Sequence, residues 1–211
     1  MCIESRIMRA RPLFLLLALI SLLPNAFAQS SERALASHTV IQQTADELLE
    51  AIEGRREVLE ANPAELYAIV DEVLRARFDA VYAARLILPR HWARITPEQR
   101  QNFVEALYGS LVRRYSIGVL KHNETRVRVT PLRSNPVPIG EEDFVTVKTL
   151  VTLDDGIEVP VNYEMRWFEN LWKIYDVNIE GRSYVFYYRG IFGQEIEAKG
   201  IDKVIEDLNA S

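Results

Sequence analysis

The chain has 211 residues, of which 48% are hydrophobic and 26% are charged, with 25 Lys and Arg against 30 Asp and Glu. These proportions are typical of globular proteins, and they exclude a disordered tail, a collagen-like repeat and a membrane protein with several spans. The length predicts one compact domain, or two small domains that share a core.

The first 28 residues have the pattern of a cleavable export signal. Three arginines precede the apolar run at 13–23, which is too short to anchor stably in a bilayer. Ala26 and Ala28 then occupy the −3 and −1 positions of a cleavage site before Gln29. The sequence therefore predicts a signal peptide at 1–28 and a mature domain at 29–211, with an uncleaved membrane anchor as the alternative.

Cleavage at this site would remove three Arg and one Glu and leave 22 basic and 29 acidic side chains, a net charge of −7. An acidic domain is poorly suited to nucleic acid or to an anionic bilayer surface. Cys2 is the only cysteine and lies within the signal. We therefore expect no disulfide and no cysteine-bound metal in the mature domain, whose stability must come from an apolar core.

The first half of the mature chain has the apolar spacing of amphipathic helices. Residues 32–60 carry one apolar stripe, which Gly54 weakens near its end. A second helix is expected to open at Asn62-Pro63, a capping residue followed by proline, and its stripe extends to Phe78. A third helical segment follows and stops at Pro89.

The segment Thr96-Pro97-Glu98-Gln99 is a further helix start, with Gln99 placed to close a capping box on Thr96. The helix that follows keeps a broad apolar face through Tyr115. The helical part of the mature chain is thus predicted at about 32–120.

After Leu120 the apolar period changes from 3.6 to 2, which predicts strands. The expected elements are a strand at 125–132, a proline-rich loop at 131–140, a strand at 145–153, a hairpin turn at Asp154-Asp155-Gly156, and strands at 157–167 and 172–180. Closing helices are expected at about 183–209. Helices followed by a curved antiparallel sheet at about 125–180 predict the α+β class, with helices over one face of the sheet.

Few residues suggest catalysis or metal binding. His38, His91 and His122 are not at metal-ligand spacing, so we expect no metal site. The sequence contains no phosphate-binding glycine loop and no nucleophile elbow. Strand alternation turns Asp176 toward a sheet face, where it could act as a general base in a pocket. An ion pair with Arg166 or Arg182 is the interpretation that we favour.

Aromatic side chains are concentrated between residues 163 and 192. They either fill a core beneath the helices or line a cavity, and composition does not decide between the two. The aromatic residues concerned are Tyr163, Trp167, Trp172, Tyr175, Tyr184, Phe186, Tyr187, Tyr188 and Phe192.

A series of short motifs also runs through most of the mature chain. The series comprises Phe78-Asp79, Leu88-Pro89-Arg90-His91-Trp92, Thr96-Pro97-Glu98-Gln99-Arg100, Phe103, Tyr115, Val161-Asn162-Tyr163, Trp172-Lys173-Ile174-Tyr175-Asp176-Val177, Glu180-Gly181-Arg182-Ser183, Tyr188-Arg189 and Gly200-Ile201-Asp202. Each motif is short, but the ordered set is specific. It resembles the MlaC family of exported phospholipid-binding proteins of Gram-negative bacteria, also called toluene-tolerance auxiliary proteins.

The resemblance implies an NTF2-like sheet with a helical subdomain that encloses the acyl chains of a glycerophospholipid. It implies a periplasmic carrier that is not an enzyme, needs no cofactor or metal, and helps to maintain the lipid asymmetry of the outer membrane. The implied partners are an outer-membrane lipoprotein complex and an inner-membrane ABC transporter with an MCE-domain subunit. We expect a monomer that binds no nucleic acid.

Physical chemistry is consistent with such a carrier. A two-chain phospholipid in water exposes on the order of thirty methylenes at about 0.8 kcal/mol each, so it requires an apolar enclosure. Unpaired polar atoms there would cost about 1–3 kcal/mol each. We expect the acyl chains to be lined by Leu74, Phe78, Leu86, Phe103, Leu107, Leu111, Val147, Val159, Val161 and Tyr163, with Tyr187 and Phe192 near the mouth.

Each of these residues could alternatively be ordinary core. Two other functions also stay open: a small-molecule enzyme with Asp176 as its base, and a periplasmic adaptor or chaperone that binds polypeptide. A carboxylate with a raised pKa in a dry pocket would favour the enzyme, and the lack of a partnering histidine disfavours it. A groove open along its length would favour the adaptor.

Overall fold

The computed structural model describes residues 24–120, 126–129, 138–139, 142–153 and 155–211. Most of the predicted signal peptide lies outside the described residues, as do His122, Asp154 and most of the proline-rich loop. Among the residues that are described, no helix is both long enough and apolar enough to cross a membrane.

The chain forms helices first, then strands, then helices again, which confirms the predicted α+β class. The helices are α1 (Pro24–Ile52), α2 (Arg56–Ala61), α3 (Pro63–Leu74), α4 (Ala80–Ile87), α5 (Pro97–Leu120), α6 (Tyr184–Lys199) and α7 (Ile201–Ala210). The strands are β1 (Arg126–Val129), β2 (Pro138–Ile139), β3 (Glu142–Thr152), β4 (Glu158–Phe168), β5 (Leu171–Ile179) and β6 (Arg182–Ser183). They pair antiparallel in the order β1-β3-β4-β5-β6, and β2 pairs with β3.

The single helix predicted at 32–60 is wrong, because the chain turns between α1 and α2. Gly54 lies in this turn with a φ of +69°, in the left-handed region that glycine adopts at little cost. The predicted start of the second helix is confirmed, because α3 begins at Pro63, directly after its N-cap residue Asn62. The Asn62 side chain makes no capping bond and instead donates through Nδ2 to Glu65 Oε2 at 3.1 Å.

The second predicted helix ends at Leu74 and does not extend to Phe78. Phe78 is extended and bridges in parallel with Ile174 of β5. The main-chain N–H of Asp79 donates to the carbonyl of Ile174 at 2.7 Å, and the N–H of Ile174 donates to the carbonyl of Arg77 at 2.8 Å. This pairing holds the α3–α4 link on the edge of the sheet, a contact that apolar periodicity does not encode.

A buried ion pair reinforces the same link. Asp79 Oδ2 lies 2.6 Å from Nη2 of Arg166 on β4, and the two side chains are only 7% and 9% exposed. Asp79 Oδ1 also accepts the N–H of Tyr82 at 2.9 Å and so caps α4. The Arg166 guanidinium lies 4.1 Å from the centre of the Tyr82 ring. The Asp79 carboxylate therefore caps the start of α4 and also holds that start against β4 of the sheet.

The capping box predicted at the start of α5 is confirmed. Thr96 Oγ1 accepts the N–H of Gln99 at 3.1 Å, and Gln99 Oε1 accepts the N–H of Thr96 at 3.0 Å. Gln99 Nε2 also donates to Asp202 Oδ1 of α7 at 2.8 Å. The start of α5 is thereby fixed relative to α7.

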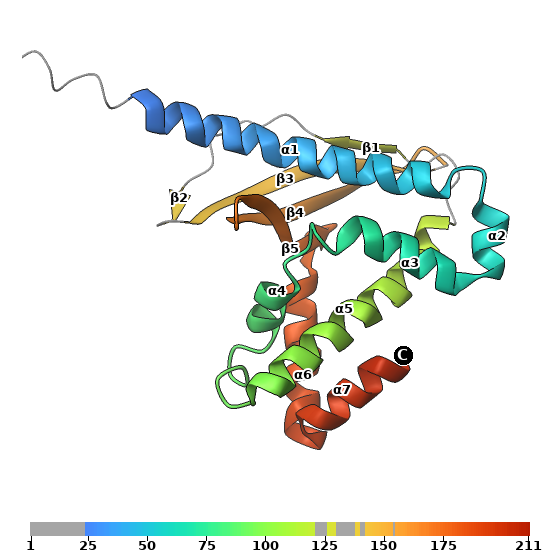
Figure 1. The fold of residues 1–211 in the computed structure, drawn as a ribbon, viewed down its shortest axis with the longest axis vertical. Helices are drawn as coiled ribbons and strands as arrows, with labels where there is room; N and C mark the ends of the chain where they lie inside the picture. The colour runs from blue at the N-terminus through green and yellow to red at the C-terminus, as the bar shows by residue number, and fades with distance from the viewer. Residues whose placement is uncertain (1–23, 121–125, 130–137, 140–141, 154) are drawn as a thin grey trace, which may run out of the picture.

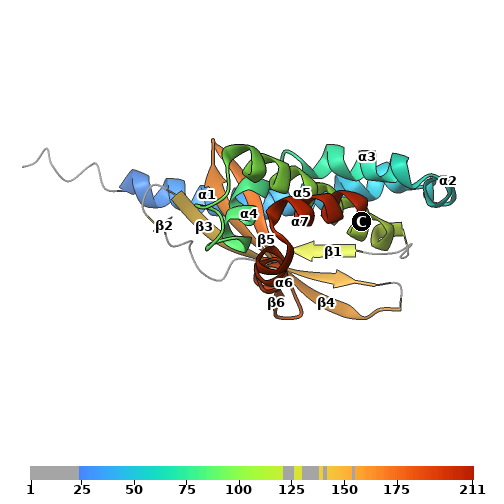
Figure 2. The ribbon, with the colours of Figure 1, turned by 90° about the horizontal axis from the view of Figure 1, so that it is seen from below.

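Three apolar clusters hold the layers together. Helix α1 lies along the sheet (Figure 1), and its Ile41 packs with Val147 and Met165. A second cluster around Phe103 joins α4, α5, α6 and α7, and a third around Leu66 joins α1, α2, α3 and α5. Seen from below, α1, α3, α5 and α7 lie on one side of β4 (Figure 2). These four helices therefore lie over one face of the sheet, whereas α6 packs against β5 and β6 at its edge.

Candidate functional site

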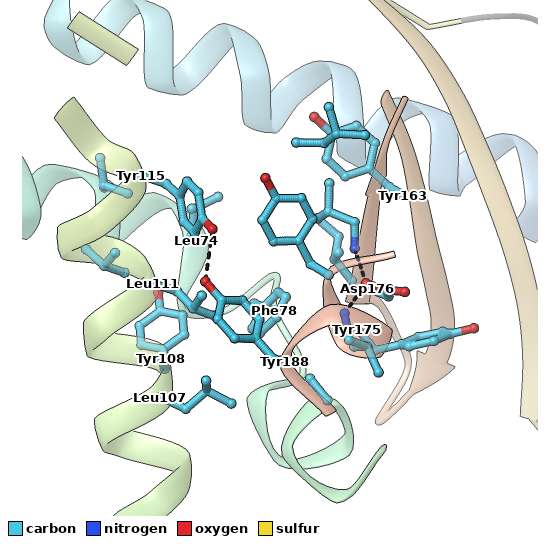
Figure 3. Close-up of a pocket in the computed structure, with 18 of the residues that line it drawn as sticks. Leu74, Phe78, Leu107, Tyr108, Leu111, Tyr115, Tyr163, Tyr175, Asp176 and Tyr188 are labelled. Atoms are coloured by element: carbon cyan, nitrogen blue, oxygen red, sulfur yellow. Dashed lines mark hydrogen bonds between the residues drawn. The ribbon is translucent and has the colours of Figure 1, made fainter. Parts of the chain in front are cut away.

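An apolar cavity of about 430 Å³ lies where the sheet meets the helices. This volume is within the range of about 300–1,000 Å³ that is usual for small-molecule sites. Side chains from α5 face Tyr163 of β4 across it (Figure 3). The cavity wall consists of Leu48, Val70, Leu74, Phe78, Ala83, Ile87, Leu107, Tyr108, Leu111, Val112, Tyr115, Ser116, Val119, Val161, Tyr163, Ile174, Tyr175, Asp176, Val177, Ile179, Tyr184, Val185 and Tyr188.

Helix α5 supplies the longest stretch of this wall. Tyr108, Leu111 and Tyr115 follow one another at i, i+3 and i+7, so they lie on one face of the helix and point the same way. Val112 and Val119 extend this face on one side. The same apolar stripe that predicted the helix thus also forms one side of the cavity.

Six of the twelve predicted site residues line the cavity, and they come from α3, the α3–α4 link, α5 and β4. The six are Leu74, Phe78, Leu107, Leu111, Val161 and Tyr163.

Three other predicted site residues lie in packed cores. The rings of Phe103 and Phe192 meet edge to face with centroids 5.6 Å apart, and Ile201 and Val204 of α7 belong to the same cluster. Helix α7 packs against α5 at this end and completes the cluster. Val147 is fully buried in the cluster between α1 and the sheet. These residues are core because α7 and α1 cover them.

The last three predicted site residues also lie outside the cavity wall. Helix α4 presents Ala83 and Ile87 to the cavity, so Leu86 faces elsewhere. Val159 pairs with Val151 of β3, two residues before the part of β4 that reaches the cavity. Tyr187 is 55% exposed on α6.

The sequence-based site missed residues at the far end of the cavity, chiefly Tyr115, Tyr184 and Tyr188. Their signals were present in the aromatic density of 184–188 and the apolar stripe of α5. The sequence did not show that these two segments, which are separated by about seventy residues, contact each other in the folded protein. Tyr115 Oη and Tyr188 Oη are 2.9 Å apart, and the rings of Tyr115 and Tyr184 meet edge to face at 5.5 Å.

Asp176 is held by structural hydrogen bonds. Its Oδ1 accepts the N–H groups of Val177 at 2.8 Å and Val185 at 2.9 Å, and its Oδ2 accepts the Ser183 hydroxyl. The ion pair expected with Arg166 or Arg182 is therefore wrong, and Arg166 pairs with Asp79 instead. Asp176 fastens the start of α6 to β5 (Figure 3). No partnering histidine lies in the cavity wall among the described residues.

Burial raises the pKa of the tyrosines at the cavity. The pKa of Tyr163 is raised because its hydroxyl is removed from water. Burial and, after it, the charge of Glu164 raise the pKa of Tyr175 to about 12. Burial likewise raises the pKa of Tyr108 and Tyr115. These hydroxyls therefore stay neutral well above physiological pH.

We expect the protein to lose stability between pH about 10 and about 12. In this window an unfolded tyrosine releases its proton, whereas Tyr175 in the folded protein keeps it up to about 12. The unfolded state then binds fewer protons than the folded state, so the free energy of unfolding falls as pH rises. Urea denaturation followed by tryptophan fluorescence at increasing pH measures this slope. The Tyr175→Phe variant should show a shallower one, and equal slopes for both proteins would contradict the expectation.

The sequence is similar to those of several known proteins. A family model described as MlaC protein matches residues 42–210. Toluene tolerance protein ttg2D from Pseudomonas putida is 29% identical over 184 residues, which cover 86% of this chain and 83% of that protein. The intermembrane phospholipid transport system binding protein MlaC from Haemophilus influenzae is 20% identical over 182 residues, which cover 82% of this chain and 81% of that protein.

A solved structure has the same fold. It is the phospholipid-binding protein from Ralstonia solanacearum, determined in complex with a phospholipid. It matches with a TM-score of 0.72 and 24% identity, covering 82% of this chain and 94% of that chain. The similarity shows that the arrangement of helices and sheet is shared.

Proposed function

This chain belongs to the MlaC family, and on that premise we propose that it binds a glycerophospholipid and carries it through water. The observation that supports this most directly is the apolar cavity of about 430 Å³ between sheet and helices. Asp176, the one carboxylate in the cavity wall among the described residues, accepts three structural hydrogen bonds from Val177, Ser183 and Val185. The Ralstonia solanacearum protein of the same fold was determined with a phospholipid bound.

The acyl chains would lie against the apolar part of the wall. We propose Leu74, Phe78 and Leu111 from the helical side and Val161 and Tyr163 from the sheet as contacts. Each buried methylene contributes about 0.8 kcal/mol, so binding strength comes from the area of contact with the tails. Carriage makes and breaks no covalent bond, and we therefore propose a binding protein rather than an enzyme.

We further propose that the protein works in the periplasm and exchanges lipid between an outer-membrane lipoprotein complex and an inner-membrane MCE-domain ABC transporter. The predicted signal peptide at 1–28 supports export. The name of the Haemophilus influenzae relative, an intermembrane phospholipid transport system binding protein, supports the route. This route and the proposed lipid contacts rest on the family and on the cavity together.

Native mass spectrometry of the mature protein tests the proposal. Protein purified under gentle conditions should carry co-purified phospholipid at one lipid per chain, and delipidated protein should take lipid up from vesicles. The apolar wall predicts retention of the lipid through purification. A protein that neither retains lipid nor takes it up would contradict carriage.

A further inference from the structure

Three tyrosines of the cavity wall meet at one edge, where α5 approaches α6. Tyr115 of α5 and Tyr188 of α6 approach from facing helices, and their hydroxyl oxygens are 2.9 Å apart (Figure 3). Tyr184 joins them through ring contacts, with centroids 5.5 Å from Tyr115 and 6.2 Å from Tyr188. We call Tyr115, Tyr184 and Tyr188 the tyrosine rim.

The tyrosine rim lies at the boundary between the buried cavity and solvent. Tyr188 is only 6% exposed, whereas Tyr115 is 42% exposed, although both line the cavity. The exposed Arg114 directly precedes Tyr115 on α5, and its charge lowers the pKa of the Tyr115 hydroxyl against the effect of burial. A ligand that fills the cavity with apolar chains would thus bring its polar end to this rim.

The hydrogen-bonding capacity of the pair defines what that polar end must offer. A phenol has one O–H donor and two acceptor positions. The Tyr184 hydroxyl also interacts with that of Tyr115. Two contacts among three phenols use two O–H groups, so one O–H of the rim is left to donate to a further group. The Tyr115 hydroxyl stays protonated, because burial raises its pKa. The tyrosine rim therefore offers a hydrogen-bond donor, and a ligand bound there must supply a hydrogen-bond acceptor.

We propose that the Tyr115–Tyr188 pair is a binding subsite for the acceptor oxygens that join the tails of the cargo to its headgroup. In a glycerophospholipid these are ester carbonyl and phosphodiester oxygens, which accept hydrogen bonds and donate none. Donation from the rim orients the lipid with its tails inside the cavity. The subsite rests on the proposed function and adds residues that recognise the polar part of the lipid.

Phenylalanine substitutions test the subsite, because they remove the hydroxyls and keep the rings that shape the wall. The variants are Tyr115→Phe, Tyr188→Phe and the double variant, with Tyr187→Phe as the matched control. Tyr187 is the neighbour of Tyr188 on α6, is 55% exposed and does not line the cavity. Urea denaturation establishes that each variant is folded before its lipid affinity is compared.

Affinity is measured by displacing a fluorescent lipid from delipidated protein with three competitors. The competitors are a diester phospholipid, a diether phospholipid with the same headgroup and chain length, and a diacylglycerol with the same chains. We expect the double variant to bind the diester phospholipid about two- to tenfold more weakly than the wild type, the effect of one lost hydrogen bond. The Tyr187→Phe control should match the wild type.

The two other lipids identify the acceptor. If the rim binds the ester carbonyl, the substitutions lower the affinity for the diacylglycerol and leave the affinity for the diether phospholipid unchanged. If the rim binds the phosphate, they lower the affinity for the diether phospholipid and leave the affinity for the diacylglycerol unchanged. Wild-type affinity of the double variant for the diester phospholipid would overturn the subsite. Equal weakening for all three lipids would also overturn it, because it would indicate a change in cavity shape. Failure of the wild type to bind any of the lipids would instead contradict the proposed function.

Discussion

Replacing Leu111 by Trp is expected to reduce phospholipid binding about tenfold or more while leaving the protein folded. Leu111 is half-buried on the cavity face of α5, between Tyr108 and Tyr115. The larger indole would occupy space that about two methylenes of an acyl chain need, at about 0.8 kcal/mol each. Leu111 packs against the cluster around Phe103 on one side and borders the cavity on the other, so the indole can extend into open space and overpacking strain should be small. The lipid content of the purified variant and its uptake from vesicles measure the effect.

Ile117→Trp is the matched control. Ile117 lies on the same helix, is 42% exposed and is not part of the cavity wall. The same change of side-chain size at this position should leave lipid content unchanged. A Leu111→Trp protein that is folded and carries as much lipid as the wild type would show that the acyl chains do not occupy this cavity.

Breaking the buried Asp79–Arg166 ion pair is expected to cause the largest loss of stability. The Arg166→Met variant should lower the free energy of unfolding by about 3–5 kcal/mol, because it leaves the Asp79 carboxylate buried without its cation. The variant also loses the contact of the guanidinium with the Tyr82 ring. Urea denaturation followed by circular dichroism measures the loss.

Two further variants test whether the loss of stability comes from the burial of the ion pair or only from the removal of an arginine. Arg75→Met removes an arginine that is 55% exposed and paired at the surface with Asp71 and Glu105, and it should cost at most about 1 kcal/mol. Adding Asp79→Asn to Arg166→Met should restore part of the lost stability, because no uncompensated charge is then buried. Equal losses for Arg75→Met and Arg166→Met would contradict the importance of burial.

The ion pair also bears on lipid binding, because Asp79 directly follows Phe78 of the cavity wall. The main-chain bonds of Arg77 and Asp79 to Ile174 set the position of Phe78 against β5. Loosening the α3–α4 link would shift Phe78 in the cavity wall although its side chain is still present. Arg166→Met should therefore weaken lipid retention as well as stability.

Much of the local structure could be predicted from the sequence, because its signals act over a few residues. The Thr96–Gln99 capping box needs only side chains three positions apart, and it forms as expected. The alternation of apolar and polar residues in β3 and β4 likewise predicted strands and the buried side of Val145 and Val161. These signals were sufficient for the α+β class, and the ordered motifs for the family.

Only the tertiary structure decided which apolar residues line a cavity and which fill a core. Phe103 and Leu107 lie one turn apart on α5 and share one core cluster, yet only Leu107 also borders the cavity. Apolar periodicity shows that a face is buried, but not what it packs against. The Tyr115–Tyr188 bond joins side chains that are distant in sequence and close only after α6 docks. Such contacts depend on how completely facing surfaces fill the space between them, which no local pattern records.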